Sequence, residues 1–154
     1  MKNIRNLVVM VFALTTSMAF AQQSTTAPAG APAADAWTHK TKRLTSTEID
    51  ALLAKPQKLL VIDVRRPDEL TAKGSFPVYL NIQAKDVENG LAYIPKDRVI
   101  ITVSNHAHRA GDVGDLLTSK GFKVAGAAGS EDYEAQGGTA IVRVSPPAPK
   151  TAAK

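Results

Sequence analysis

The chain has 154 residues, a formal net charge of +5 and no cysteine. Without cysteine it cannot use thiolate, persulfide or disulfide chemistry of its own, so its stability must come from ordinary packing. The length suits one domain, and the positive charges form no basic block of the kind that follows a nucleic-acid backbone. Nucleic-acid binding is therefore disfavoured.

The first segment, residues 1–21, has the pattern of a secretory signal peptide. Lys2 and Arg5 precede an apolar run at 7–14, and Ala-Phe-Ala at 19–21 forms a small-x-small cleavage site. An uncleaved anchor is the alternative, but the run is shorter than the roughly 20 residues of a membrane span. Because no cysteine follows the cleavage site, lipoprotein anchoring is excluded. We expect a periplasmic or secreted protein that does not remain in the membrane after cleavage.

Two segments have compositions that oppose folding. Residues 22–36 consist mainly of Ala, Pro, Thr and Ser and cannot bury enough apolar surface to offset their ordering entropy. Residues 145–154 are rich in proline, which removes backbone hydrogen-bond donors. We therefore expect a disordered linker at 22–36, one folded domain at 37–144 and a disordered tail at 145–154.

Within the predicted domain, short apolar runs alternate with helix-like segments, which is typical of an α/β domain with a mostly parallel sheet. The runs at 59–62 and 99–103 are almost continuously apolar, which indicates central strands covered on both faces. The sequence thus predicts a five-stranded sheet flanked by helices. The predicted strands are, in chain order, 37–42 at an edge, 59–62, 78–82, 99–103 and 122–124.

The first predicted helix has a clear start signal. Thr45 and Glu48 have the spacing of a capping box, and Ile49 and the leucines that follow form one apolar face. This helix is expected to end near Pro56. Shorter helices are expected at 67–73, 84–90 and 131–136.

A longer helix is predicted from His108 or Arg109 to Lys120, with Gly121 as its C-terminal cap. Two glycines inside it, Gly111 and Gly114, each cost about 1 kcal/mol relative to alanine. We expect close packing of this helix against the sheet to compensate.

The junction between the strand at 99–103 and this helix is the candidate site. In an open α/β sheet, ligands bind beyond the carboxyl ends of strands, where the next helix presents free N–H groups. A compact loop would turn successive amides inward to form an anion-binding nest, to which Arg109 adds charge. Many such polar junctions bind nothing, so the local sequence leaves both interpretations open. The candidate anion-binding loop comprises Ser104, Asn105, His106, Ala107, His108 and Arg109.

Motifs along most of the chain make the interpretation of this junction more specific. Residues 61–70 read as a strand followed by Asp-Val-Arg and an acidic helix start, and 104–110 read as a loop ending in Arg and a small residue. Together with Gly74, Asn81-Ile82 and a glycine-containing pattern at 121–137, the chain resembles the rhodanese domain family over about residues 38–138. The resemblance implies a rhodanese-like fold and an ancestry in sulfurtransferases. It also implies that Asp63 and Arg65 support the loop.

The departures from the family pattern affect the expected activity. Ser104 stands where the family has its nucleophilic cysteine, Ser75 where it has His, Val78 where it has Gly, and Ala110 where it has Ser. Rhodaneses carry sulfur as a cysteine persulfide, which needs a thiolate. A serine hydroxyl stays protonated and cannot hold a persulfide. The resemblance therefore implies no catalytic residue at Ser104.

The sequence gives weaker support to two other functions, serine hydrolysis and metal binding. Serine-hydrolase activity would need a base that reaches Ser104, and no Gly-x-Ser-x-Gly elbow is present. A metal could lie between His106 and His108, with His39 as a remote third ligand, but no carboxylate or cysteine spacing completes a site. Solvent-exposed histidines are the better interpretation, so no metal and no cofactor are expected.

The sequence favours an exported, catalytically inactive rhodanese-like domain that serves as an anion-binding or protein-interaction module. Its expected partner is a small oxyanion or a protein, and its oligomeric state is left open. The alternative is a sulfurtransferase-type enzyme that moves thiosulfate or sulfane sulfur, as family membership would suggest.

Overall fold

The computed structural model describes residues 36–143. The predicted signal peptide, the predicted tail at 145–154 and all but the last residue of the predicted linker lie outside the described residues. The elements are α1 (Ser46–Leu53), η1 (Pro56–Lys58), β1 (Leu59–Asp63), α2 (Pro67–Lys73), β2 (Tyr79–Asn81), η2 (Ala84–Asp86), α3 (Val87–Gly90), η3 (Leu91–Tyr93), β3 (Val99–Ser104), α4 (Ala107–Ser119), β4 (Lys123–Gly129) and α5 (Ser130–Ala135).

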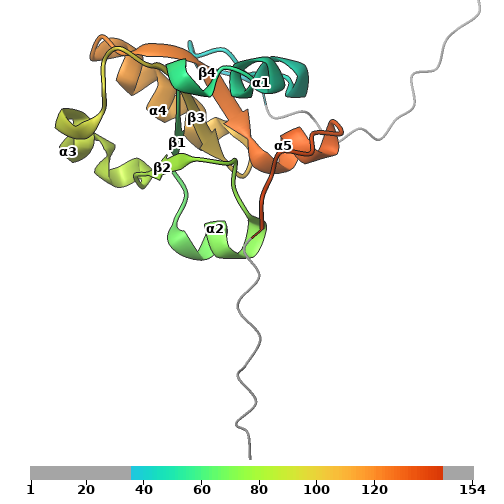
Figure 1. Ribbon diagram of the computed structural model, residues 1–154. Coiled ribbons are helices and arrows are strands. Elements are labelled where there is room, and N and C mark those ends of the chain that lie inside the picture. Colours follow the sequence, from blue (N-terminus) through green and yellow to red (C-terminus); the bar gives the residue numbers. More distant parts are fainter. Residues whose placement is uncertain (1–35, 144–154) are drawn as a thin grey trace, which may run out of the picture. The chain divides into compact units, whose positions relative to one another are not determined.

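The sheet has four parallel strands in the order β2-β1-β3-β4 (Figure 1). Its inner strands β1 and β3 are the two continuous apolar runs, as predicted, and they pair in register from Leu59 with Val99 to Asp63 with Val103. Because all strands are parallel, their carboxyl ends meet at one edge. Asp63 and Ser104 therefore end neighbouring strands at the same edge of the sheet.

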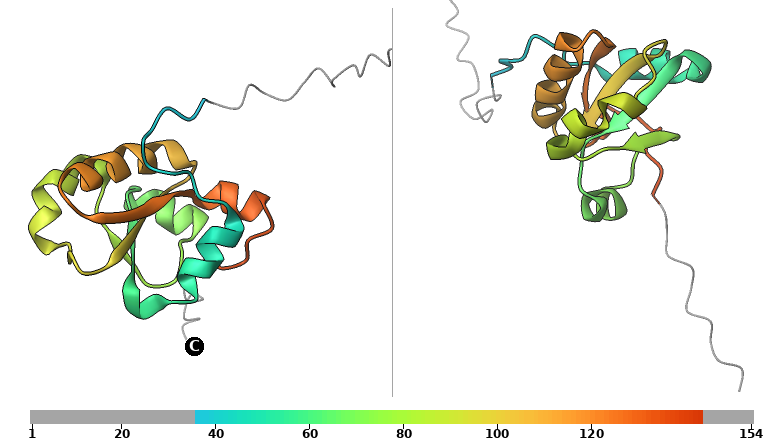
Figure 2. Two further views of the ribbon diagram at one scale, coloured as in Figure 1. Left: turned by 90° about the horizontal axis from the view of Figure 1, so that it is seen from above. Right: turned by 90° about the vertical axis from the view of Figure 1, so that its left-hand side faces the viewer.

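Both faces of the sheet are covered, which explains why β1 and β3 lack a polar face. Val61 and Ile101 contribute to one core with Ile49 of α1 and Tyr133 of α5. On the opposite face, Ile62 and Ile100 lie in a second core with Val87 of α3 and Leu117 of α4. Figure 2 shows α1 and α4 on opposite sides of the strands.

The prediction of an edge strand at 37–42 is wrong, because this segment forms no strand. Within the described residues the sheet has four strands rather than five. Only a single bridge, between Arg43 and Ala127, connects this part of the chain to β4. The backbone N–H groups of Lys40 and Thr41 instead donate to the carboxylate of Asp115 in α4, at 3.0 and 2.6 Å. These donors are therefore satisfied by a side chain and not by a strand ladder.

The two glycines of α4 have a role beyond the predicted packing against the sheet. A Cβ atom added at Gly111 would lie 2.6 Å from His39, and one added at Gly114 would lie 2.6 Å from Thr41. The glycines therefore let the segment 37–41 approach the helix closely, while Val113 and Leu117 face the core. The predicted packing of α4 against the sheet is present, and the contact with this segment adds to it.

Several local predictions are confirmed. The capping box of Thr45 and Glu48 begins α1, and α4 is followed by Gly121 with a positive φ of 82°. The strand predicted at 122–124 is longer, because the small residues of 125–129 continue β4 along β3. None of the helices within residues 36–143 combines the length and apolar character needed to cross a membrane.

Candidate functional site

Ser104 is the last residue of β3, and its side chain is almost completely buried, at 1 % exposure. Its hydroxyl donates to the carbonyl oxygen of His106 at 2.5 Å and accepts from the amide of Ala110 at 3.1 Å. The neighbouring hydroxyl of Thr102 donates to the carbonyl oxygen of Ala110 at 2.8 Å. Both hydroxyl groups are thus used to hold the start of α4 against β3.

The predicted anion-binding loop is shorter than the sequence indicates. Only Asn105 and His106 lie between β3 and α4, and the remaining three residues, from Ala107 to Arg109, form the first turn of the helix. We refer to residues 104–109 as the helix-start segment. Its residues do lie at the carboxyl end of β3, where amides of a helix start are available to an acceptor.

A carboxylate of the same chain lies at this helix start. Asp132 of α5 accepts hydrogen bonds from the amide of Ala107 at 3.3 Å, from Nδ1 of His106 at 2.9 Å and from Arg43 at 2.8 Å. Burial by itself would raise the pKa of Asp132, but these hydrogen bonds outweigh it and the pKa is lowered. An ionised carboxylate therefore occupies the position that a helix start offers to an anion.

Arg109 is also paired within the chain. Its guanidinium donates to both oxygens of Glu69 in α2, at 3.0 and 2.8 Å, in the two-pronged geometry that suits a carboxylate. Glu69 further accepts from the side chain of Asn105 at 2.8 Å and the amide of Arg66 at 3.0 Å. The hydrogen bonds from Arg109, chiefly, lower the pKa of Glu69 to about 2. The charge of Arg109 is therefore balanced by a group that stays ionised.

Asp63 and Arg65 form a fully buried ion pair beneath the helix-start segment. Arg65 donates to the two carboxylate oxygens of Asp63 at 2.9 and 2.7 Å. Its remaining donors reach the side chains of Asn105 and Ser130 at 3.0 Å each and the carbonyl oxygen of Gly74 at 2.7 Å. One side chain thus joins β1, the end of β3, α5 and the end of α2.

The three histidines do not gather at one point. His39 and His108 lie 3.3 Å apart between ring nitrogens and pack against Trp37, whereas His106 faces Asp132 and Glu131. His106 is exposed, as the sequence favoured, but the prediction is wrong for His108, which is only partly exposed and packs against Trp37; His39 is mostly buried. Among the described residues, no group of three or more His, Asp or Glu side chains is placed to hold a metal.

Sequence reasoning missed Glu69 and Asp132. Each belongs to an acidic helix start, which is visible in the sequence. Which cation or amide each one reaches depends on the packing of α2 and α5 against α4, and no local pattern records it.

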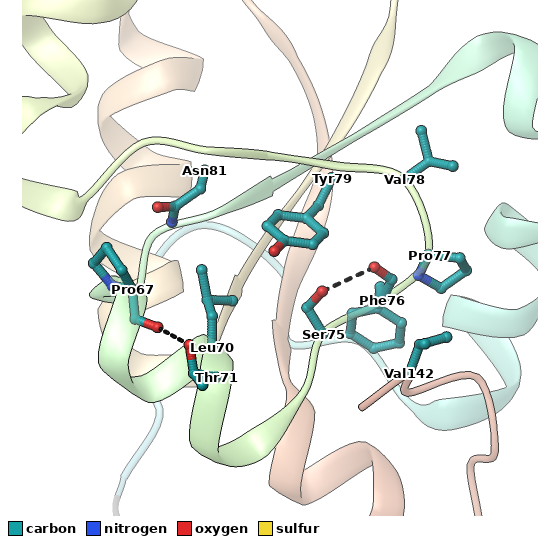
Figure 3. Close-up of a pocket in the computed structure, with 10 residues that line it drawn as sticks. All are labelled: Pro67, Leu70, Thr71, Ser75, Phe76, Pro77, Val78, Tyr79, Asn81 and Val142. Atoms are coloured by element: carbon teal, nitrogen blue, oxygen red, sulfur yellow. Dashed lines mark hydrogen bonds between the residues drawn. The ribbon is translucent and has the colours of Figure 1, made fainter. Parts of the chain in front are cut away.

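It also missed an apolar groove between α2 and the segment that leads into β2. The groove has a volume of about 680 Å³, and Tyr79 and Leu70 face it from opposite sides (Figure 3). Val142 lies at its edge. We call this the α2–β2 groove; it is lined by Pro67, Leu70, Thr71, Ser75, Phe76, Pro77, Val78, Tyr79, Asn81 and Val142.

No family model matches this chain, and no curated protein matches it. Solved structures do. A rhodanese-like domain protein of Staphylococcus aureus aligns with a TM-score of 0.56 and 21 % identity, over 68 % of this chain and 99 % of that one. The single-domain sulfurtransferase of Saccharomyces cerevisiae aligns with a TM-score of 0.53 and 22 % identity, over 69 % of this chain and 98 % of that one.

A polysulfide-sulfur transferase homodimer of Wolinella succinogenes aligns with a TM-score of 0.54 and 25 % identity, over 67 % of this chain and 80 % of that one. Such identities establish the shared fold, while the chemistry of each site depends on its own residues. The α/β architecture, the parallel sheet and these neighbours together show that the chain has a rhodanese-like fold.

Proposed function

We propose that this domain is a protein-interaction module with a rhodanese-like fold that does not transfer sulfur. The observation that carries the proposal is the state of Ser104. Its hydroxyl is buried and engaged with His106 and Ala110, in a chain that has no cysteine. Sulfur transfer through a persulfide needs an accessible thiolate, and a buried, protonated hydroxyl does not replace it.

The charges around the helix-start segment support a protein partner over a free oxyanion. Asp132 already accepts a hydrogen bond from the amide of Ala107, and Glu69 already accepts hydrogen bonds from both terminal nitrogens of Arg109. An incoming sulfate or phosphate would have to displace an ionised carboxylate that has the same charge sign. The cost of separating that pair reduces any gain from the new contacts.

Oxyanion binding, or binding of an acidic group of a partner, is the second candidate. It is favoured by one observation: the side chain of Arg109, in the first turn of α4, is 37 % exposed to solvent. A ligand that reaches this guanidinium would compete with Glu69. Export is part of the same proposal and is supported by the signal-like pattern of residues 1–21.

A sulfur-transfer assay from thiosulfate to cyanide tests the proposal. The wild-type chain is expected to show no turnover above the uncatalysed rate. The Ser104→Cys variant restores a sulfur atom at this position, and turnover confined to that variant would show that the scaffold is intact. Turnover by the wild-type chain would refute the proposal and support the sulfurtransferase alternative.

A further inference from the structure

Two histidines from distant parts of the chain meet on α4. Nε2 of His39 and Nδ1 of His108, in the first turn of the helix, lie 3.3 Å apart. Trp37 packs against both rings, with centroid distances of 4.6 Å to His39 and 5.3 Å to His108. This aromatic cluster joins residues 37–41, which we call the strap, to the outer side of α4 (Figure 2).

The strap fits closely onto the helix. A Cβ atom added at Gly111 would lie 2.6 Å from the ring of His39 and 2.9 Å from the ring of Trp37. Glycine is unfavourable inside a helix, so its presence here is explained by this contact. The side chain of His39 is consequently only 11 % exposed. The position of the strap therefore depends on short-range contacts with α4.

The two ends of the strap are held by different groups. At one end, the carboxylate of Asp115 accepts hydrogen bonds from the amides of Lys40 and Thr41, at 3.0 and 2.6 Å, and from the hydroxyl of Thr41 at 2.7 Å. Burial by itself would raise the pKa of Asp115, but these hydrogen bonds outweigh it and the pKa is lowered. This end therefore stays attached in mild acid. The other end, at Trp37, contacts α4 through the aromatic cluster.

The contact between the two histidines needs a single hydrogen between the facing nitrogens. Nδ1 of His39 lies 3.3 Å from the carboxylate of Asp112, which favours a hydrogen on Nδ1 and leaves Nε2 as the acceptor for Nδ1–H of His108. One added proton preserves this arrangement, since one ring still donates to the other. When both rings are protonated, every ring nitrogen carries a hydrogen. The two facing nitrogens then repel each other.

The charges around the pair act in opposite directions. Asp112 and Asp115 on α4 favour a positive charge on the histidines, but the side chain of Asp112 is 75 % exposed, so water screens it. On the side of the strap, Lys40 follows His39 in the chain, and the guanidinium of Arg43 lies 5.9 Å from the ring centroid of Trp37. These cations oppose a second proton. A doubly charged pair therefore loses its hydrogen bond without a compensating buried anion among the described residues.

We propose that His39 and His108 form a pH-sensitive switch, in which protonation of both rings releases the Trp37 end of the strap from α4. Release exposes Trp37 and uncovers the face of the helix at Gly111, next to the helix-start segment, while Asp115 keeps the other end attached. Histidine is the side chain whose charge ordinarily changes between about pH 5 and 8. The inference goes beyond the proposed function and does not depend on it.

The composition of the chain allows a direct test, because Trp37 is its only tryptophan. The emission wavelength of Trp37 and its quenching by acrylamide are measured on the full chain from about pH 8 to about pH 5, the range in which histidine changes charge. Acidification is expected to shift the emission to longer wavelength and to raise the quenching constant at least about twofold, with unchanged far-UV circular dichroism. A constant quenching constant would overturn the inference. Loss of the circular dichroism signal over the same range would show unfolding of the domain and would also overturn it.

Matched variants assign the response to the pair. His39→Gln and His108→Asn each place an uncharged amide near the facing nitrogen, so two charges can no longer meet there. In both variants the exposure of Trp37 is expected to be the same at the two ends of the pH range. His106→Gln is the control, because this third histidine faces Asp132 instead, and it is expected to keep the wild-type response. A response that persists in both pair variants, or that disappears in the control, would overturn the assignment.

Discussion

The helix-start segment and the α2–β2 groove lie in the same domain but differ in how completely their groups are satisfied. At the helix-start segment, Ser104, Arg109 and the first amide of α4 each have a partner within the chain. The groove instead exposes apolar side chains and a strained valine. The helix-start segment, which is the candidate site, is thus closed by internal contacts, and the exposed apolar surface lies elsewhere.

The largest expected effect breaks the buried pair that supports the closed region. Arg65→Met leaves the carboxylate of Asp63 buried without its cation, and we expect the free energy of unfolding to fall by about 3 to 5 kcal/mol. Urea denaturation measures this. The control Arg66→Met removes an exposed cation and is expected to leave the midpoint unchanged. A similar midpoint for both variants would show that Arg65 does not hold the elements together.

A smaller loss is expected from Ser104→Ala. The change leaves the carbonyl oxygen of His106 and the amide of Ala110 without a partner, at a cost of about 1 to 3 kcal/mol. Ser119→Ala is the matched control, because its hydroxyl also bonds to a helix carbonyl but is exposed, and we expect a change within about 0.5 kcal/mol. If the two variants unfold at the same urea concentration, the hydroxyl of Ser104 is not structural.

At the groove, the expected effect has the opposite sign. Val78→Gly removes the strain of a positive φ without losing buried surface, and we expect a gain of about 1 kcal/mol in thermal denaturation. Val142→Gly makes the same substitution at another exposed valine whose φ is not positive, and it is expected to destabilise. A loss of stability in Val78→Gly would show that the valine side chain is needed by the folded domain.

The smallest effect, about 1 kcal/mol or less, is expected from Glu69→Gln, which weakens a partly exposed ion pair with Arg109. Because the pKa of Glu69 is lowered from 4.5 to about 2 in the folded state, ionised Glu69 contributes stability above pH 4.5. That contribution is lost as the pH falls from 4.5 towards about 2. The difference between wild type and variant should shrink over this interval.

Glu69→Gln also tests whether the closed region hides an anion site. Calorimetry with sulfate is expected to show no binding to the wild-type chain and weak binding to the variant, since the charge of Arg109 is then no longer balanced by Glu69. The control Glu88→Gln, at an exposed residue of α3, should behave like the wild type in both experiments. Sulfate binding by the wild type would favour the second candidate function.

Much of the fold follows from local patterns. The strands β1 and β3 are continuous apolar runs that have to be buried on both faces, and the capping box of Thr45 and Glu48 marks the start of α1. The absence of cysteine, and the place of Ser104 in the pattern, are likewise properties of the sequence alone. These features are local or compositional, so they need no knowledge of distant contacts.

Other features of the fold and the site depend on tertiary contacts. The segment 37–42 does not form a strand because Asp115, far along the chain, takes the backbone donors of Lys40 and Thr41. Glu69 and Asp132 reach the start of α4 only because α2 and α5 pack beside it. Hydrogen bonds and ion pairs depend on distance and direction in space. The sequence alone therefore indicated which groups belong to the candidate site, and only the tertiary structure determined which partners they contact.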